Sequence, residues 1–269
     1  MDDLRGRVAV ITGGGSGIGR GTALAFAREG TIPVIAEIDA ERAAAVEREA
    51  RELGVDAAGV QCDVTSDDDF TNLRDLTLER FGRVDIVMNN VSVIPIGRPE
   101  TLPMDAWRRS IDVNLLSVVR SLHVFLPLLL EQGSGHLVNT ASTAGLFAYA
   151  FERLPYSATK SAVVGMSEAL ALYLRPKGVG VTCLCPGPVA TNIMEQINFH
   201  DDVPINSPLD LEIMDPASVG DMVVDAVRAN TFLLLTHGEQ VRDILIRRAQ
   251  DPEGFLAAQI AALGDFPAS

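Results

Sequence analysis

The sequence predicts a doubly wound α/β fold, in which one parallel sheet of seven strands carries helices on both faces. Short β-branched runs alternate with longer helical patterns, and the runs are continuously apolar instead of alternating with polar residues. Continuous apolar runs are typical of parallel strands covered on both faces, and regular β–α alternation is typical of doubly wound sheets. Because no linker, composition shift or internal repeat divides the 269 residues, we expect a single domain over 1–269.

The expected strands are the runs in which β-branched and other apolar residues are consecutive. They lie at residues 8–11, 34–36, 58–62, 85–88, 136–140, 179–185 and 232–235. A sheet of this type binds ligands beyond the carboxyl ends of its strands. Polar or glycine-rich sequence follows each of the first six strands, so we expect the functional residues there.

The expected helices lie between the strands and in the C-terminal part of the chain. Residues 66–68 provide an N-terminal cap, Pro155 and Pro216 suit the first turn of a helix, and Pro252 interrupts the last helical pattern. The helices are expected at residues 17–28, 40–53, 66–81, 104–130, 155–176, 216–229 and 239–263.

Two segments depart from the regular alternation. Residues 192–215 have little regular pattern but many apolar side chains. They predict a mobile lid over an apolar substrate, the alternative being ordinary packing on the domain. Residues 236–269 form a C-terminal helical extension to which the sequence assigns no role.

Charge and hydropathy exclude several classes of function. A formal net charge of −14 disfavours binding to nucleic acid or to anionic membranes, which needs clustered Lys and Arg. The densest apolar stretch, residues 122–130, is far shorter than the ~20 residues that span a bilayer. The acidic N-terminus does not match a signal or transit peptide. We therefore expect neither a nucleic-acid nor a membrane partner.

The cysteines point to a reducing compartment. Cys62, Cys183 and Cys185 are too few for a disulfide framework and lack the spacing of a zinc site. Cys183 and Cys185 stand two apart on an expected strand, so both face the same side of the sheet. We expect reduced core cysteines, no metal site and a cytoplasmic location.

A glycine-rich turn follows the first strand and precedes a helix. The sequence pattern is Gly-x-x-x-Gly-x-Gly, formed by Gly13, Gly17 and Gly19. Ser16 and Ile18 lie between these glycines. Backbone N–H groups at a helix N-terminus bind a pyrophosphate, and glycine permits its close approach. The alternative is a turn used for packing, but its place after the first strand favours a dinucleotide site.

Acidic and amide side chains follow the next strands. Glu37 ends the second strand about 20 residues after Gly17, where an acid accepts both hydroxyls of the adenosine ribose and repels a 2′-phosphate. Neither Ile38 nor Ser16 is basic, so NAD is the expected cofactor. Asp63 is placed to accept from the adenine amino group, or else to cap a turn. Asn90 is expected to tie neighbouring loops and to contact the cofactor.

A Tyr–Lys pair provides the expected chemistry. Tyr156 and Lys160 lie four residues apart, on one face of the expected helix, and Tyr156 follows Ser142 by 14 positions. An ammonium beside a phenol lowers its pKa from ~10 toward the working pH and makes it a general acid/base. Ser142 is placed to bond the substrate oxygen. The chain has twenty arginines but only two lysines, one of which is Lys160. A lysine four residues after Tyr156 therefore argues against a chance pairing.

Together these motifs resemble those of the short-chain dehydrogenase/reductase family, over residues 5–235. The matching residues are Thr12-Gly13-x-x-x-Gly17-Ile18-Gly19, Asp63-Val64, Asn89-Asn90, Asp112-Val113-Asn114, Ser142, Tyr156-x-x-x-Lys160 and Pro186-Gly187. The resemblance implies a single Rossmann-fold catalytic domain and an NAD-dependent oxidoreductase acting on CH–OH groups. It also implies a homodimer or homotetramer, formed through the helices that end near residues 130 and 176.

The resemblance also implies roles for individual residues. Asn114, Ser142, Tyr156 and Lys160 would be catalytic: Ser142 orients the oxygen, Tyr156 transfers its proton, Lys160 lowers the tyrosine pKa and binds the nicotinamide ribose, and Asn114 holds a water. Pro186, Gly187, Val189 and Thr191 would flank the nicotinamide and diphosphate. The whole expected cofactor site is Gly13, Ser16, Gly17, Ile18, Gly19, Glu37, Asp63, Val64, Asn90, Tyr156, Lys160, Pro186, Gly187, Val189 and Thr191.

Three features depart from the family pattern. Val91 and Ser92 replace the smaller pair that usually follows Asn-Asn, and the Ser142–Tyr156 spacing is one residue longer than usual. The longer loop, with Phe151 and Glu152, is expected to bulge toward the substrate. The chain after residue 235 lacks the family's common glycine-rich ending.

The expected substrate is a hydrophobic secondary alcohol or ketone with an aryl, alicyclic or steroid-like skeleton. Apolar residues of the 192–215 segment would cover it, and the side walls are expected from Val93, Ile94, Ile96, Leu146, Phe147 and Phe151. Two alternatives stay open: a 3-oxoacyl thioester reductase, against which Glu37 argues, and a non-catalytic NAD(H)-sensing regulator, against which the Tyr156–Lys160 pair argues.

Overall fold

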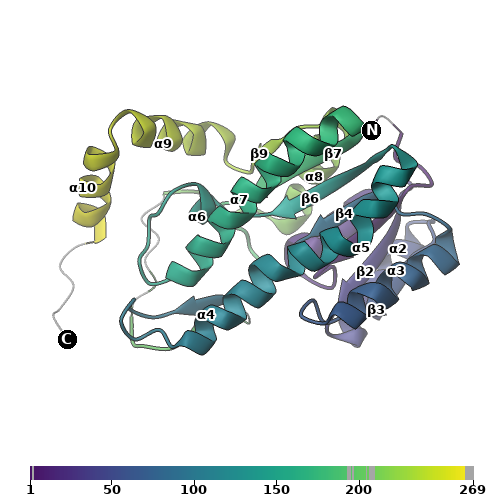
Figure 1. The fold of residues 1–269 in the computed structure, drawn as a ribbon, viewed down its shortest axis with the longest axis horizontal. Helices are drawn as coiled ribbons and strands as arrows, with labels where there is room; N and C mark the ends of the chain where they lie inside the picture. Colours follow the sequence, from purple (N-terminus) through teal and green to yellow (C-terminus); the bar gives the residue numbers. More distant parts are fainter. Residues whose placement is uncertain (2, 193–194, 196, 204, 206–209, 264–269) are drawn as a thin grey trace.

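A seven-stranded parallel sheet forms the centre of the computed structural model, which describes residues 1, 3–192, 195, 197–203, 205 and 210–263 (Figure 1). The strand order is β3-β2-β1-β4-β6-β7-β9. The strands are β1 (Val8–Thr12), β2 (Ile32–Glu37), β3 (Ala58–Gln61), β4 (Ile86–Asn89), β6 (Gly135–Thr140), β7 (Val179–Cys185) and β9 (Leu233–Leu235). All seven predicted strands are present, and the predicted fold class is confirmed.

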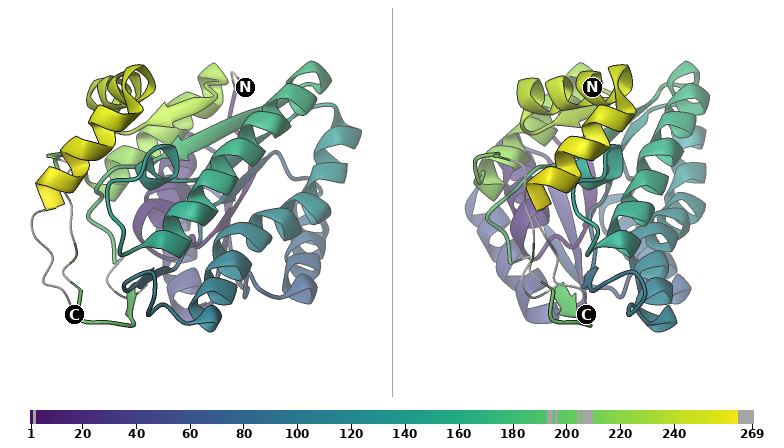
Figure 2. Two further views of the ribbon diagram at one scale, coloured as in Figure 1. Left: turned by 60° about the vertical axis from the view of Figure 1, so that its left-hand side comes forward. Right: turned by 90° about the vertical axis from the view of Figure 1, so that its left-hand side faces the viewer.

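Helices cover both faces of the sheet (Figure 2). One layer consists of α1 (Gly17–Arg28), α2 (Ala40–Glu52) and α8 (Pro216–Ala229). The other consists of α3 (Asp67–Phe81), α5 (Ser117–Gln132) and α7 (Leu154–Leu174). Shorter elements are α4 (Met104–Ile111), a π-helical turn at Asp112–Leu116, α6 (Thr143–Leu146) and a 3₁₀ turn at Arg175–Lys177.

The core explains why the strands are continuously apolar. Successive residues of a strand point to opposite faces of the sheet. In β1, Ala9 and Ile11 pack toward the α1 and α8 layer, whereas Val8 and Val10 pack toward the α3 and α5 layer. Because both faces are covered, all four side chains are almost fully buried. Apolar residues therefore occupy four consecutive positions of this strand.

The helices begin where side chains can satisfy their free N–H groups. Asp39 accepts from the backbone of Glu41 and Arg42 at the start of α2, and Ser66 accepts from Asp69 at the start of α3. Asp215 caps α8 in the same way, with Pro216 in its first turn. These caps lie directly after strand ends or loops, so they fix where each crossover turns back over the sheet.

The topology concentrates the strand ends around one crevice. The strand order reverses between β1 and β4, and ligands of doubly wound sheets bind at such a switch point. Thr12 and Asn89 end these two strands, and Glu37 and Thr140 end their outer neighbours β2 and β6.

The 192–215 segment is less irregular than predicted. Ile197–Phe199 forms β8, which pairs in parallel with β5 (Ile94–Ile96) in a two-stranded sheet. The sequence did not predict these two strands, because each has three residues and is stabilised by a partner about 100 residues away in the chain. Part of the predicted lid, residues 193–194, 196, 204 and 206–209, lies outside the described residues.

The helical layer contains one unusually long apolar stretch. Met104–Gln132 is continuous over 29 residues, with a window of mean hydropathy 1.8, so by length and composition it could cross a membrane. It is longer than the predicted apolar stretch of residues 122–130 because α4, the π-helical turn and α5 follow one another without a break. Phe125 and Leu129 are fully buried against the sheet. We interpret the stretch as part of the helical layer.

The C-terminal extension is helical, as predicted. It comprises α9 (Gly238–Gln250) and α10 (Pro252–Leu263), which extend from the body of the fold beyond β9 (Figure 1). The break falls at Asp251, next to the predicted Pro252. Phe255 of α10 packs edge-on against Phe147 with ring centroids 6.1 Å apart, and Arg248 donates to the Leu146 carbonyl at 3.3 Å. The extension therefore contacts the loop that precedes α7.

A buried histidine predicts acid sensitivity of the fold. His136 in β6 is 2% exposed, its Nε2 lies 2.8 Å from Thr182 Oγ1, and burial lowers its pKa to about 3. In the unfolded chain this histidine binds a proton near pH ~6.5, so below that pH the unfolded state holds the extra proton. Stability therefore falls as the pH drops from about 6.5 toward 3. We expect a loss of up to about 1.4 kcal/mol per pH unit.

The measurement is urea unfolding at several pH values between about 7 and 5, above the range in which ordinary carboxylates titrate. His136→Gln is expected to flatten the pH dependence, whereas His123→Gln, at an exposed position of α5, should leave it unchanged. Equal slopes in the wild type and His136→Gln would contradict the assignment.

Candidate active site

A cleft of about 510 Å³ lies at the carboxyl ends of the strands. It collects most of the predicted site residues from loops that are far apart in the sequence. Its lining includes Gly13, Ser16, Gly17, Ile18, Glu37, Asp63, Val64, Asn90, Ser142, Tyr156, Lys160, Pro186, Gly187, Val189 and Thr191. Gly19 and Asn114 are the predicted site residues that do not border it.

The glycine loop has the geometry that a tight strand-to-helix turn needs. Gly13 has φ +64°, a left-handed conformation that favours glycine, and its N–H donates to the Ala36 carbonyl at 2.8 Å. A Cβ on Gly19 would lie 2.1 Å from the Gly13 carbonyl oxygen. Gly19 therefore permits the turn itself to close, which explains why it lies behind the cleft surface.

The N-terminus of α1 faces the cleft through this loop. Ser16 occupies the N-cap position without a side-chain hydrogen bond to the helix, so the first N–H groups of α1 are left for a ligand. Thr191 lies on the other side, beside Gly17. A helix N-terminus bordered by glycines suits an anionic diphosphate. The residues present thus fit a dinucleotide cofactor.

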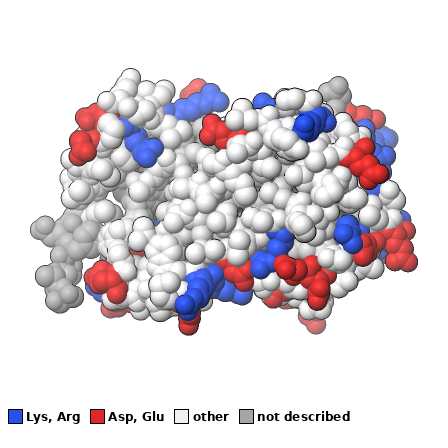
Figure 3. All heavy atoms as spheres, viewed as in Figure 1, with Lys and Arg blue, Asp and Glu red and all other residues white. Residues whose placement is uncertain are grey.

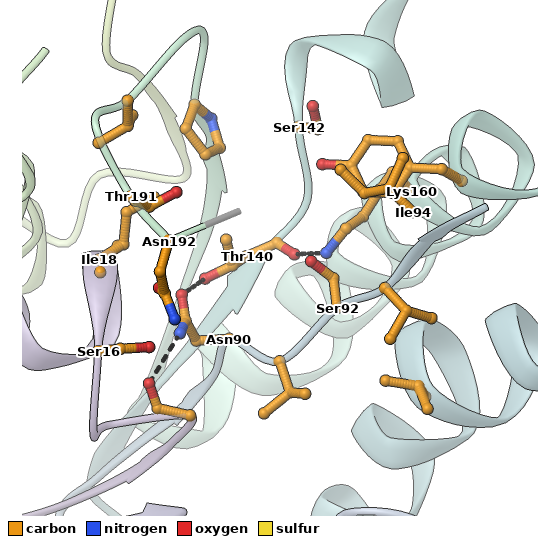
Figure 4. Close-up of a pocket in the computed structure, with 18 of the residues that line it drawn as sticks. Ser16, Ile18, Asn90, Ser92, Ile94, Thr140, Ser142, Lys160, Thr191 and Asn192 are labelled. Carbon is orange, nitrogen blue, oxygen red and sulfur yellow. Dashed lines mark hydrogen bonds between the residues drawn. The ribbon is translucent and has the colours of Figure 1, made fainter. Parts of the chain in front are cut away.

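Asn90 joins three loops at the centre of the cleft (Figure 4). Its Nδ2 donates to the Gly13 carbonyl at 3.4 Å, and its Oδ1 accepts from Thr140 Oγ1 at 3.4 Å. Val91 packs against the glycine loop, because a Cβ on Gly13 would lie 2.9 Å from Val91 Cγ2. The residue at position 91 therefore leaves no room for a side chain at Gly13.

Glu37 lies against the same loop from the end of β2. Its Oε2 accepts from the Gly15 N–H at 3.1 Å and its Oε1 accepts from the Ile38 N–H at 3.0 Å. These backbone donors fix the carboxylate at the cleft wall. Each carboxylate oxygen has a further lone pair for a ligand hydroxyl.

Asp63 is held by its own turn. Its Oδ1 accepts from the backbone N–H and the hydroxyl of Thr65, at 2.9 and 2.7 Å. Burial favours the neutral acid, but these hydrogen bonds together with the charges of Arg109 and Arg120 outweigh it and lower the pKa of Asp63. Both readings of Asp63 are therefore compatible with its position, since it caps a turn and also borders the cleft.

Lys160 and Ser142 meet the cleft from opposite sides of its catalytic end (Figure 4). Lys160 is 1% exposed, and its Nζ donates to the Thr140 carbonyl at 2.7 Å. Ser142 accepts from the Ala144 N–H at 3.1 Å and also hydrogen-bonds Tyr156. The tyrosine hydroxyl is thereby held next to Ser142, one turn before Lys160 on α7.

The pKa of Tyr156 differs from the prediction. Burial raises it to about 12, and the hydrogen bond with Ser142 opposes this only in part. The Lys160 ammonium lies 5.7 Å from the centroid of the tyrosine ring, and is bonded to Thr140. Its own pKa is lowered by burial, to about 8. Desolvation of the phenol therefore has a larger effect on the pKa of Tyr156 than the positive charge of Lys160 has.

Asn114 lies behind the cleft, where its side chain hydrogen-bonds to two other segments of the chain. It lies in the π-helical turn between α4 and α5, a type of turn frequent at functional sites. Its Oδ1 accepts from the Val93 N–H at 2.8 Å, and its Nδ2 donates to the Val93 carbonyl and to Thr159 Oγ1. The side chain thus connects the loop after β4 to α7. The water that Asn114 is expected to hold stays a prediction.

The substrate walls differ in part from the prediction. Val93 and Ile94 border the cleft, and Ile213 from the predicted lid does so too. The other predicted wall residues, Ile96, Leu146, Phe147 and Phe151, do not border it. Phe147 is 2% exposed and forms a second layer behind Tyr149, with ring centroids 6.0 Å apart.

The loop before α7 also contributes residues that the sequence did not indicate. Tyr149 and Arg153 border the cleft, with the Arg153 guanidinium 5.4 Å from the centroid of the Tyr149 ring. Glu152 does not bulge toward the substrate: it is fully buried, and pairs with Arg153 at 2.8 Å. Its backbone carbonyl accepts from the Gly97 N–H, which draws the loop inward.

A family model described as short chain dehydrogenase matches residues 7–202. The chain belongs to the short chain dehydrogenase family. The seven-stranded sheet, the glycine loop and the Ser142–Tyr156–Lys160 group agree with that assignment. Its relatives are named as dehydrogenases and oxidoreductases, and the protein is an oxidoreductase acting on CH–OH groups.

Three similar proteins illustrate the range of this family. Cyclohexanol dehydrogenase from Acinetobacter sp. is 36% identical over 202 residues, or 74% of this chain and 80% of that protein. A 3-oxoacyl-[acyl-carrier-protein] reductase from Synechocystis sp. is 34% identical over 199 residues, or 74% and 80%. The crystal structure of a family member from Burkholderia phymatum in complex with NAD has a TM-score of 0.84 and 30% identity, covering 100% and 99% of the two chains.

Proposed function

We propose that this short chain dehydrogenase is NAD-dependent and transfers a hydride between the cofactor and a hydrophobic secondary alcohol or ketone of aryl, alicyclic or steroid-like skeleton. The observation that carries the proposal is the Ser142–Tyr156–Lys160 group at the end of a cleft with apolar side walls. Val93, Ile94 and Ile213 supply apolar surface beside this group, which suits a ligand held by burial instead of by charge.

The roles of the protein groups follow from their positions. Tyr156 is the general acid/base: in ketone reduction its hydroxyl donates a proton to the substrate oxygen, and in alcohol oxidation, the reverse step, the tyrosine oxygen takes that proton back. Ser142 hydrogen-bonds the same oxygen and orients it. Lys160 supplies positive charge beneath the tyrosine ring. When bound, the nicotinamide accepts or donates the hydride.

The cofactor assignment rests on Glu37. Its carboxylate is fixed beside the glycine loop by two backbone N–H groups and has capacity for the adenosine ribose hydroxyls. Ser16, Gly17 and Thr191 would hold the diphosphate, and Lys160 and Tyr156 the nicotinamide ribose. The NAD complex of the Burkholderia protein supports this choice.

The alternative of a 3-oxoacyl thioester reductase is supported by the Synechocystis relative and by Arg153 at the cleft. The NAD(H)-sensing regulator has less support, because both Tyr156 and Lys160 are in place. A panel of secondary alcohols with NAD, with 3-oxoacyl thioesters and NADH in parallel, separates these candidates. We expect turnover of cyclic or aryl alcohols. Turnover confined to thioesters would favour the alternative, and NADH binding without any turnover would favour the regulator.

We also propose that the protein is a cytoplasmic homodimer or homotetramer. The three cysteines are thiols and buried, which suits a reducing compartment. On α7 the small residues Ala162, Gly165 and Ala169 are exposed, and Leu172 is 79% exposed on the same helix. Figure 3 shows uncharged surface across this side of the molecule, where α5 and α7 lie in Figure 1. Small residues on such a face permit close packing of a second copy.

Replacing Gly165 by Arg is expected to dissociate the oligomer. A Cβ at Gly165 meets nothing within 4 Å, so the folded subunit accommodates the change, whereas a packed second copy would not. The measurement is molar mass in solution by light scattering. Gly238→Arg, at another glycine with open space and outside α7, is the matched control. An unchanged mass of Gly165→Arg would rule out this face as the interface.

A further inference from the structure

An ion pair joins the start of α2 to the segment after β7 at the edge of the cleft. Arg42 Nη2 lies 2.9 Å from Glu195 Oε2, and the Asn192 amide donates to the same oxygen at 3.0 Å. The hydrogen bonds from Asn192 and Arg42 lower the pKa of Glu195. The carboxylate is therefore ionised at neutral pH. All three residues border the cleft.

Arg42 is anchored next to Glu37. A Cβ built on Gly15 would lie 2.7 Å from Glu37 Cγ and 2.9 Å from Arg42 Cβ, so the two side chains start together beside the glycine loop. Neither Ser16 nor Ile38, the positions at which the sequence would place a basic residue for a 2′-phosphate, is basic. The fold nevertheless brings a guanidinium to the same end of the cleft from the first turn of α2.

We propose that Glu195 is a specificity-determining residue for the cofactor, because it engages an arginine that would otherwise pair with a 2′-phosphate. The inference rests on the proposed function, in which Glu37 binds the adenosine ribose. A guanidinium is a strong bidentate partner for phosphate. In this protein Glu195 pairs with Arg42 Nη2, while Asp39 lies 3.5 Å from Arg42 Nε, so a phosphate would have to displace Glu195 to reach Nη2. Two carboxylates thus act against NADP(H), Glu37 at the ribose and Glu195 through Arg42.

The test measures the dissociation constants of NADH and NADPH by fluorescence titration of the purified full-length protein at low salt. Glu195→Gln is expected to tighten NADPH binding by about tenfold or more, because an arginine–phosphate pair typically contributes that much. NADH binding should change less than about threefold. Arg42→Ala in the wild-type background is expected to leave the ratio of the two constants unchanged, because Arg42 does not reach the phosphate while Glu195 holds it.

The double variant Glu195→Gln with Arg42→Ala decides between this mechanism and simple loss of a negative charge. We expect it to return NADPH binding to the wild-type level. A gain that persists without Arg42 would overturn the proposal, as would an unchanged constant in Glu195→Gln. Glu29→Gln is the matched control, since it releases Arg228 from an ion pair at the other end of α1 and should alter neither constant.

The titrations also separate this inference from the proposed function. Equal affinity of the wild type for NADH and NADPH would contradict the proposed NAD preference itself. A wild type that prefers NADH, with the same preference in Glu195→Gln, would reject only the role of Glu195.

Discussion

Tyr156→Phe is expected to reduce kcat by about 10²–10⁴-fold while leaving NADH affinity nearly unchanged. The substitution removes the one hydroxyl that Ser142 holds at the catalytic end of the cleft, and keeps the ring that packs over Lys160. Lys160 is not in place to replace it as the acid/base, because its Nζ lies 5.7 Å from the centroid of the tyrosine ring and donates to the Thr140 carbonyl. Steady-state kinetics with the best alcohol of the panel, together with NADH titration, measures both quantities.

Tyr149→Phe is the matched control for this experiment. Tyr149 also borders the cleft, and loses the same hydroxyl in the variant, but its ring packs against Phe147. We expect less than about a tenfold change in kcat. If Tyr156→Phe retained activity within about threefold of the wild type, Tyr156 would not be the general acid/base.

The fold could be predicted almost completely because its signals are local. Each strand of the main sheet is covered on both faces, so burial alone made Val8 to Ile11 and similar runs apolar. The two short strands were missed for the opposite reason. Ile94–Ile96 and Ile197–Phe199 each have three residues, and their pairing depends on a partner that no local pattern reveals.

The site was predictable where one motif contains the whole geometry. Gly13 to Gly19 form one loop and the first residues of α1, and Tyr156 and Lys160 share a helix, so spacing placed the members of each motif together. Arg42, Tyr149 and Arg153 border the same cleft through tertiary packing, and their spacing matches no motif. An arginine in the first turn of α2, five residues after Glu37, was a signal that could have found Arg42.

The pKa of the buried Tyr156 could not be predicted from the spacing of the motif either. The i,i+4 relation of Tyr156 and Lys160 is present, yet it does not bring the ammonium to the hydroxyl, since Nζ lies under the ring and bonds Thr140. The sign of the pKa change depends on how much water the fold removes from the phenol. In this site, desolvation is the larger effect.

The cofactor preference follows from the position of Glu37. If its carboxylate accepts both ribose hydroxyls, two charge-assisted hydrogen bonds of roughly 1.5–3 kcal/mol each favour NAD. A 2′-phosphate would lose these bonds and would place like charges together. We expect kcat/KM for NAD to exceed that for NADP by more than about 100-fold, equivalent to about 2.7 kcal/mol.

Glu37→Ser combined with Ile38→Arg is expected to narrow or reverse this preference. Glu37→Ser removes the carboxylate that repels a phosphate, and with it the acceptor for the Gly15 N–H. Ile38→Arg adds a guanidinium that can pair with a phosphate, at a position where the wild-type side chain is 56% exposed. Lowered kcat/KM with NAD and raised kcat/KM with NADP should appear together, because one carboxylate controls both. Ile38→Arg alone is the control, and should gain little while Glu37 still opposes the phosphate and offers the new arginine a carboxylate partner. If the wild type used NADP as readily as NAD, the Glu37 carboxylate would not face the ribose, and the role of the β2 terminus in this cleft would have to be reassigned.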